Sequence, residues 1–202
     1  MPVKKIESLA MEFKQVKLKY KDIFDMKEFY TAMREYLNDK QWTDYAEGND
    51  QWETFYGEKV GQNGAKEVWI KWRVQKAAPD SNQIIYHLDL DYHCLGLSST
   101  EIVKEGMKLK VNKGEMELTL KPVIEKVYEK KFKEDSILKY ALDIFNQRAY
   151  RKELEERKKE LYQEVYAMQN FIKQWFKMKR YLPYEESKVL YPSYAWPSHL
   201  KE

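Results

Sequence analysis

Hydrophobic and polar residues alternate along much of the first 130 positions, and this period of two predicts half-buried β-strands. The alternation is clear in residues 13–20 (FKQVKLKY), 52–59, 66–76 and 83–95. Strands are also expected at residues 107–111, 115–120 and 123–132. Hairpin turns are expected at residues 61–64 (GQNG) and 112–114 (NKG), and a short helical turn at residues 98–104. Because short turns join neighbouring strands, the sheet is expected to be antiparallel.

In two places the apolar period lengthens to about 3.6, which predicts helices. Residues 25–38 begin with Asp25 and Glu28 at the spacing of an N-terminal cap, followed by an apolar stripe. A much longer helix is expected from about residue 135 to residue 181, because neither glycine nor proline occurs between Pro122 and Pro183. At about 1.5 Å per residue this helix would be about 70 Å long, so it either bends back onto its domain or projects toward a partner.

The second half of this long helix carries an apolar seam that resembles a short coiled coil. Apolar residues recur every seven positions at Leu154, Leu161, Met168 and Trp175. Val165 and Ile172 lie between them on the same side of the helix. The seam is expected to pack on the sheet of the same chain or on a partner. The last 20 residues hold three prolines and the aromatic residues Tyr191, Tyr194 and Trp196, so an extended segment with interface anchors is expected there.

The sequence therefore predicts an α+β protein, in which an antiparallel six- to seven-stranded sheet packs against helices. Residues 1–150 are expected to form the sheet domain. Residues 151–182 are expected to form a long C-terminal helix or helical arm, and residues 183–202 an extended tail. This order of elements resembles the START-like helix-grip superfamily, in which a curved antiparallel sheet wraps a long final helix. The resemblance covers roughly residues 11–150 and implies a hydrophobic ligand held between helix and sheet.

Composition narrows the classes of function. Lysine and arginine number 36 against 33 acidic residues, a net charge of +3 that is too balanced to indicate nucleic-acid binding by itself. Cys94 is the only cysteine, so no intrachain disulfide is expected and a reducing, cytoplasmic compartment is favoured. The first 13 residues lack the apolar core of a signal peptide, and no run of about 18 apolar residues predicts a transmembrane helix.

One strand carries the sharpest candidate for chemistry. Its polar residues alternate onto one face, about 7 Å apart, in the order His87, Asp89, Asp91 and His93. Imidazole and carboxylate groups suit zinc, iron or manganese, so one hypothesis is a divalent-metal site. The alternative is a solvated polar row whose aspartates pair with Lys71 and Arg73 across the sheet.

The sequence shows no nucleophile–base motif, phosphate-binding glycine loop or paired-cysteine metal motif, which favours a non-catalytic role over an enzyme. The leading hypothesis is an interaction or assembly protein that contacts a protein partner or a second copy through the C-terminal helix and tail. One alternative is a helix-grip module that binds an apolar small molecule, and another is a metal-dependent enzyme. Basic residues beside aromatic ones near the end of the long helix also suit nucleic acid or a membrane surface; these are Lys173, Lys177, Lys179 and Arg180.

Overall fold

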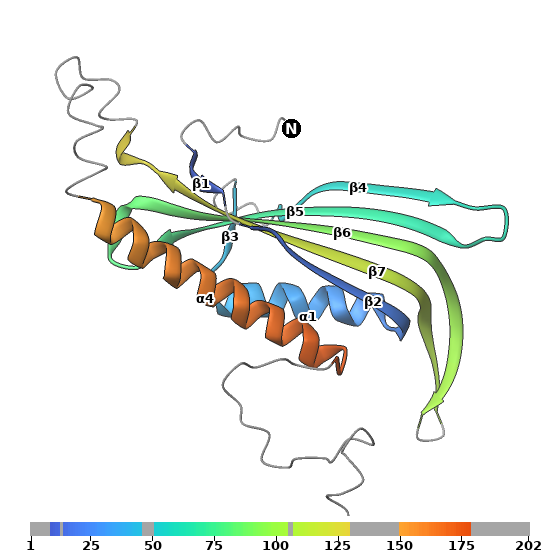
Figure 1. Cartoon of the computed structure of the whole chain (residues 1–202). Coiled ribbons are helices and arrows are strands. Elements are labelled where there is room, and N and C mark those ends of the chain that lie inside the picture. Colours follow the sequence, from blue (N-terminus) through green and yellow to red (C-terminus); the bar gives the residue numbers. More distant parts are fainter. Residues whose placement is uncertain (1–8, 13, 46–50, 105–106, 130–149, 179–202) are drawn as a thin grey trace, which may run out of the picture.

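The alternating segments form a seven-stranded antiparallel sheet in the computed structural model, which describes residues 9–12, 14–45, 51–104, 107–129 and 150–178 (Figure 1). The strands are β1 (Leu9–Glu12), β2 (Val16–Phe24), β3 (Thr43–Asp44), β4 (Glu53–Val60), β5 (Lys66–Ala78), β6 (Ser81–Lys104) and β7 (Met107–Lys126). Their order is β1-β7-β6-β5-β3, with β2 also paired to β7 and β4 also paired to β5. The predicted α+β class with an antiparallel sheet is confirmed.

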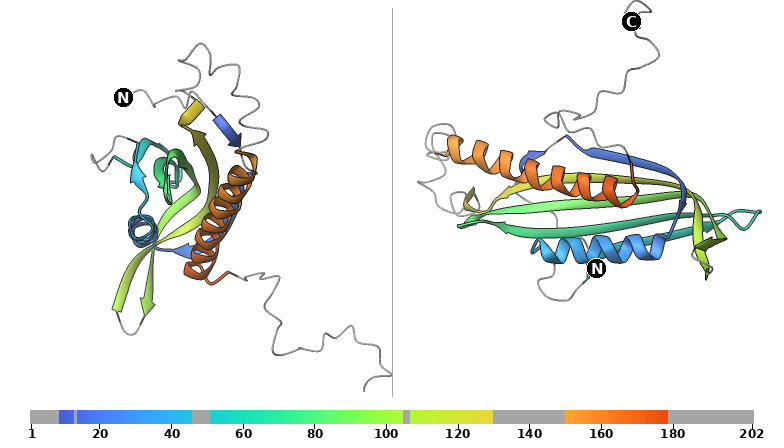
Figure 2. Two further views of the ribbon diagram at one scale, coloured as in Figure 1. Left: turned by 90° about the vertical axis from the view of Figure 1, so that its left-hand side faces the viewer. Right: turned by 90° about the horizontal axis from the view of Figure 1, so that it is seen from below.

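Two helices, α1 (Met26–Asp39) and α4 (Arg151–Trp175), lie on the same face of this sheet (Figures 1 and 2). That face is apolar because every second residue of the central strands points into it. The buried sheet residues are Val68, Ile70, Trp72 and Val74 of β5, Ile84, Tyr86, Leu88, Leu90, Tyr92 and Cys94 of β6, and Met116, Leu118, Leu120 and Ile124 of β7. Arg73, Asp89 and Asp91 lie on the opposite face, whereas Lys76 of β5 lies on the helix side, with its Nζ 2.8 Å from Glu164 of α4.

Helix α1 begins where the sequence pattern predicts. The Asp25 side chain accepts a hydrogen bond from the Glu28 main-chain N–H at 2.9 Å, which satisfies one of the free donors of the first turn. Phe29, Met33 and Leu37, spaced four residues apart, are fully buried against the sheet. The helix is therefore fixed to the sheet along one stripe.

Two turn predictions are wrong, because β6 and β7 continue through both segments. Residues 98–104 belong to β6, and the hairpin expected at residues 112–114 is part of the uninterrupted strand β7. Gly96 has a positive φ of 61° within a register shift between Leu95 and Ser98, so it forms a bulge. A Cβ on Gly114 would lie 3.0 Å from the Leu95 main-chain oxygen, so this glycine permits close strand contact instead of a turn. At this point both strands curve toward the helices (Figure 1).

The structure also corrects the prediction of a separate helical arm at residues 151–182. Helix α4 packs on the sheet, and Leu154, Leu161, Val165, Met168 and Ile172 are each at most 5% exposed within the core of the same chain. The physical reason is the width of the apolar sheet face, which α1 alone does not cover. The expected start of the helix near residue 135 lies outside the described residues.

Candidate functional site

The polar row of β6 lies on the sheet face opposite the helices, as its alternation predicts. Each of its members contacts a neighbouring strand: His87 contacts Glu125 of β7, Asp89 and Asp91 contact Arg73 of β5, and His93 contacts Glu67 of β5. The sequence therefore placed the four side chains on one face correctly. The contacts decide what that face does.

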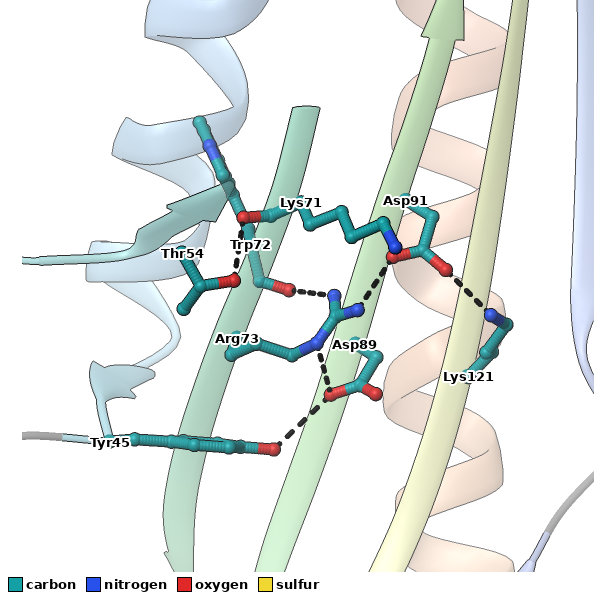
Figure 3. A network of polar contacts seen from close by, with 8 residues as sticks. All are labelled: Tyr45, Thr54, Lys71, Trp72, Arg73, Asp89, Asp91 and Lys121. Atoms are coloured by element: carbon teal, nitrogen blue, oxygen red, sulfur yellow. Dashed lines mark hydrogen bonds and ion pairs between the residues drawn. The ribbon is translucent and has the colours of Figure 1, made fainter. Parts of the chain in front are cut away.

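Arg73 is the centre of the polar network shown in Figure 3. Its guanidinium lies 3.3 Å from Asp89 Oδ1 through Nε and 2.8 Å from Asp91 Oδ1 through Nη2. Lys121 of β7 donates to Asp91 Oδ2 at 2.6 Å, and the Tyr45 hydroxyl donates to Asp89 Oδ1 at 3.2 Å. The network thus joins three adjacent strands by charge-assisted hydrogen bonds.

The two aspartates respond differently to this environment. Burial raises the pKa of Asp89, and the opposing effects of Arg73 and Tyr45 do not overcome it. Burial also acts on Asp91, but the hydrogen bond from Lys121 and the charge of Arg73 outweigh it, so the pKa of Asp91 is lowered. Both groups are committed to neighbours within the sheet.

Each of the two histidines at the ends of the row pairs with a different glutamate. His87 Nε2 lies 2.7 Å from Glu125 Oε2 in a buried pair. His93 Nε2 lies 3.0 Å from Glu67 Oε1, and its ring stacks on Trp69 with a centroid separation of 5.4 Å. Neither imidazole converges on the aspartates.

The structure therefore disagrees with the metal hypothesis for His87, Asp89, Asp91 and His93. Across the described parts of the chain, no group of three or more His, Cys, Asp or Glu residues is placed to hold a metal ion. The alternative of cross-strand pairing holds for Arg73. It fails for Lys71, whose ammonium lies over the Phe55 ring at 5.4 Å.

The predicted interface along the long helix also changes. Five seam residues are buried in the chain's own core, and Trp175 packs on Phe29 of α1 with ring centroids 4.9 Å apart. The seam is therefore not available to a partner. The tail anchors Tyr191, Tyr194 and Trp196 lie outside the described residues.

The basic and aromatic residues at the end of α4 do not form one surface. Phe176 is 6% exposed and Trp175 packs against the core, while Lys179 and Arg180 lie outside the described residues. The combination of stacking aromatics and lysines that suited nucleic acid or a membrane is thus divided between core and surface.

A groove on the helix side of the sheet is the candidate site that the sequence pattern did not indicate. It lies between the first turns of α1 and strands β4, β5 and β6, and its volume is about 750 Å³. Apolar side chains from three elements line it: Met26, Val68, Ile70, Cys94 and Leu97. Because these residues are up to 71 positions apart in the chain (97 minus 26), only the folded sheet brings them together.

Polar groups stand at the rim of this groove. The Tyr30 hydroxyl donates to Glu53 Oε2 at 2.7 Å and accepts from Trp72 Nε1 at 3.1 Å, so its orientation is fixed from two sides. Lys66 pairs with Glu58 at 2.8 Å. An apolar floor with a few oriented polar groups is the usual arrangement of a small-molecule site.

A second hollow of about 720 Å³ lies beside the β6 bulge, but its chemistry differs. Charged side chains of Lys21, Asp22, Lys113 and Glu115 dominate its lining, together with the glycines of the bulge. Leu95 is the only apolar side chain among the described residues that line it, against the five of the groove under α1. The groove under α1 is therefore the stronger candidate.

Comparison of this chain with protein-family models, with curated protein sequences and with solved structures finds no match. Within the described residues, neither helix is long and apolar enough to cross a membrane.

Proposed function

We propose that this protein is a non-catalytic binding module that holds an apolar small molecule with one polar end in the groove beneath α1. The observation that supports this most directly is the groove itself, about 750 Å³ in volume with an apolar floor. Ligand pockets in proteins commonly measure about 300–1,000 Å³. The site is thus large enough for a molecule of lipid or drug size.

The arrangement of the groove favours retention of an apolar ligand. Contact with Val68, Ile70 and Leu97 would remove apolar ligand surface from water, at about 25 cal/mol for each Å². The fixed Tyr30 hydroxyl and the Lys66–Glu58 pair can orient a polar end at the rim. A hydrophobic ligand held between a helix and the sheet is also what the resemblance to the START-like helix-grip superfamily implies, although the helix there is the long final one and here it is α1.

The protonation states of the groove favour binding over catalysis. Burial raises the pKa of the Cys94 thiol to about 11, so it remains protonated and a poor nucleophile at neutral pH. Burial, together with the hydrogen bond to Glu53, raises the pKa of Tyr30 to about 12. Neither group is poised to exchange a proton near pH 7.

Two measurements on the full chain test this proposal. Native mass spectrometry of the purified protein should detect a bound lipid-like species. Titration with the fluorescent probe 1-anilinonaphthalene-8-sulfonate should show saturable binding to the folded protein. Met26→Trp should weaken probe binding about tenfold, because the larger ring occupies part of the groove.

Ile23→Trp is the matched control, since it adds the same ring to a residue that is 39% exposed and does not line the groove. This variant should bind the probe like the wild type. The proposal is wrong if the folded protein shows neither a bound species nor saturable probe binding. Equal binding by the two tryptophan variants would also place any site elsewhere.

A further inference from the structure

Strand β4 forms an edge of the sheet whose outer side pairs with no described strand. Among the described strands it pairs with β5 alone, in a ladder that joins Val60 to Lys66 at one end and Glu53 to Trp72 at the other. The β4–β5 hairpin also extends beyond the rest of the sheet (Figure 1). An open edge of this length is a template for another strand.

The main-chain groups that this edge offers can be assigned from the hairpin turn. Gly61 N–H donates to the Ala65 carbonyl at 2.8 Å, so these two residues form a hydrogen-bonded pair. Such pairs alternate along an antiparallel ladder, and Lys59, Gly57 and Phe55 therefore bond to β5. The residues between them, Tyr56 and Glu58, direct their N–H and C=O groups away from the sheet.

The side chains of β4 also differ from those of a protected edge. Phe55 is 50% exposed on one face and Tyr56 is 53% exposed on the other. Strand β2 at the opposite side of the sheet instead carries lysine at alternate positions 17, 19 and 21, a pattern that discourages strand addition. The two edges thus differ in composition, because β4 combines exposed aromatic side chains with charges of both signs, whereas lysines alternate along β2.

We propose that β4 pairs antiparallel with β4 of a second copy of this chain, about a two-fold axis at Gly57. In this register Tyr56 faces Glu58 of the second copy, and the two residues exchange main-chain hydrogen bonds on each side of the axis. Phe55 faces Lys59 of the second copy, a cation–aromatic pair. Glycine at the axis leaves no side chains to collide there.

Charge disfavours the registers that lie on the hairpin-turn side of the proposed one. Outward-facing residues must oppose one another, so the registers change in steps of two. If the two-fold axis moves to residue 58, Glu58 of one chain faces Glu58 of the other. If it moves to residue 59, Lys59 faces Lys59, so each of these registers opposes like charges. The proposed register faces no charged residue with a like charge and uses the strand from Thr54 to Val60. The alternative centred on Tyr56 opposes Glu53 to Lys59 but separates Phe55 from Lys59. It is less favourable because Glu53 lies beyond a register shift in β4 and already accepts a hydrogen bond from Tyr30.

The first test measures mass and amide protection on the full chain. Light scattering after size exclusion should show a twofold rise in mass with protein concentration. Hydrogen exchange by NMR should show protection of the Tyr56 and Glu58 amides only at concentrations where the dimer forms. Gly57 and Lys59 amides, which bond to β5, should be protected at all concentrations. A chain that stays monomeric at every concentration overturns the proposal, whatever other strand the edge then accepts.

A charge exchange tests the register. Phe55→Lys places lysine opposite Lys59 of the second copy and should raise the dimer dissociation constant about tenfold. Adding Lys59→Glu to that variant should restore the dimer, because opposite charges then face each other twice. Circular dichroism checks that both variants fold. A dimer that Phe55→Lys leaves unchanged, or that Lys59→Glu does not restore, would show that this register is wrong.

Discussion

Asp89 and Asp91 occupy equivalent positions on one face of β6, yet their pKa values move in opposite directions. Both contact Arg73, but only Asp91 also accepts a hydrogen bond from Lys121, at 2.6 Å. At Asp91 burial is outweighed by the hydrogen bond from Lys121 together with the charge and hydrogen bond of Arg73. At Asp89 burial prevails over the opposing effects. The stabilising role in the network therefore falls mainly on Asp91.

We expect Asp91→Asn to destabilise the protein at pH 7 by about 1–3 kcal/mol, the typical loss when a charged hydrogen bond partner is removed. Because the folded-state pKa of Asp91 is lowered, its contribution is complete above the ordinary aspartate pKa of about 3.9. It is lost as the pH falls through the lowered value. Chemical denaturation at a series of pH values should therefore show a constant gap between wild type and variant down to about pH 5 and a shrinking gap below about pH 4.

Asp89→Asn is the matched control with the opposite sign. Burial raises the folded-state pKa of Asp89, so its protonation stabilises the folded protein as the pH falls. The variant lacks this gain, and the stability gap to the wild type should therefore widen with falling pH. If both variants respond to pH in the same direction, the assignment of roles to the two carboxylates is wrong.

At the scale of elements, α4 shows why an apolar repeat does not specify its partner. Seven-residue spacing places Leu154, Leu161 and Met168 on one side of a helix whether the opposing surface is a helix or a sheet. In this chain the opposing surface is the sheet, and α4 buries the seam beside α1. The sequence predicts the stripe because helix geometry is local. It does not predict the surface that covers it, since that depends on contacts distant in the chain.

Leu161→Ala should lower the free energy of unfolding by about 2–5 kcal/mol, because Leu161 is 0% exposed and a cavity would remain. Tyr162→Ala is the neighbouring control: Tyr162 is 50% exposed, and its replacement should change stability by less than about 1 kcal/mol. Urea denaturation measures both values. Equal small effects would mean that α4 does not pack on the sheet in solution.

The strands illustrate the same limit. Alternation predicts β5 and the central part of β6, and the GQNG segment predicts the turn between β4 and β5. The NKG segment contains the same residue types as a hairpin but lies within the uninterrupted strand β7. Gly114 is required there by the nearby Leu95 carbonyl, which the local sequence does not reveal. Glycine marks a backbone constraint without identifying its cause.

At the scale of the whole molecule, the groove arises from a mismatch in length. Strand β5 has 13 residues and spans about 43 Å at about 3.3 Å each, whereas α1 has 14 residues and spans about 21 Å. The helix therefore covers only part of the apolar face, and the groove lies between its first turns and the strands. The lengths can be read from the sequence, but the position of the helix along the strands cannot. The polar row of β6 is a local pattern that the sequence reveals, whereas the groove depends on contacts between residues distant in the chain.

The division of the chain leads to a last prediction, for a variant that ends at Tyr150. This truncation removes α4 and uncovers buried sheet residues such as Tyr86, whose hydroxyl donates to Glu160 of α4. Burial of the five seam residues of α4 contributes about 8–15 kcal/mol to the free energy of unfolding, at about 1.5–3 kcal/mol each. This contribution is comparable with the total stability of a domain. The shortened chain should therefore lose near-ultraviolet circular dichroism and cooperative unfolding.

A chain that ends at Met178 is the control for this truncation, since it keeps α4 and every buried residue of the described core. It should unfold cooperatively, with a urea m-value near that of the full chain, because m follows the surface exposed on unfolding. If the chain ending at Tyr150 instead unfolds cooperatively with an m-value reduced only slightly, α4 is not part of the core. The helix would then be free to act as an arm, and a partner for its seam would have to be sought.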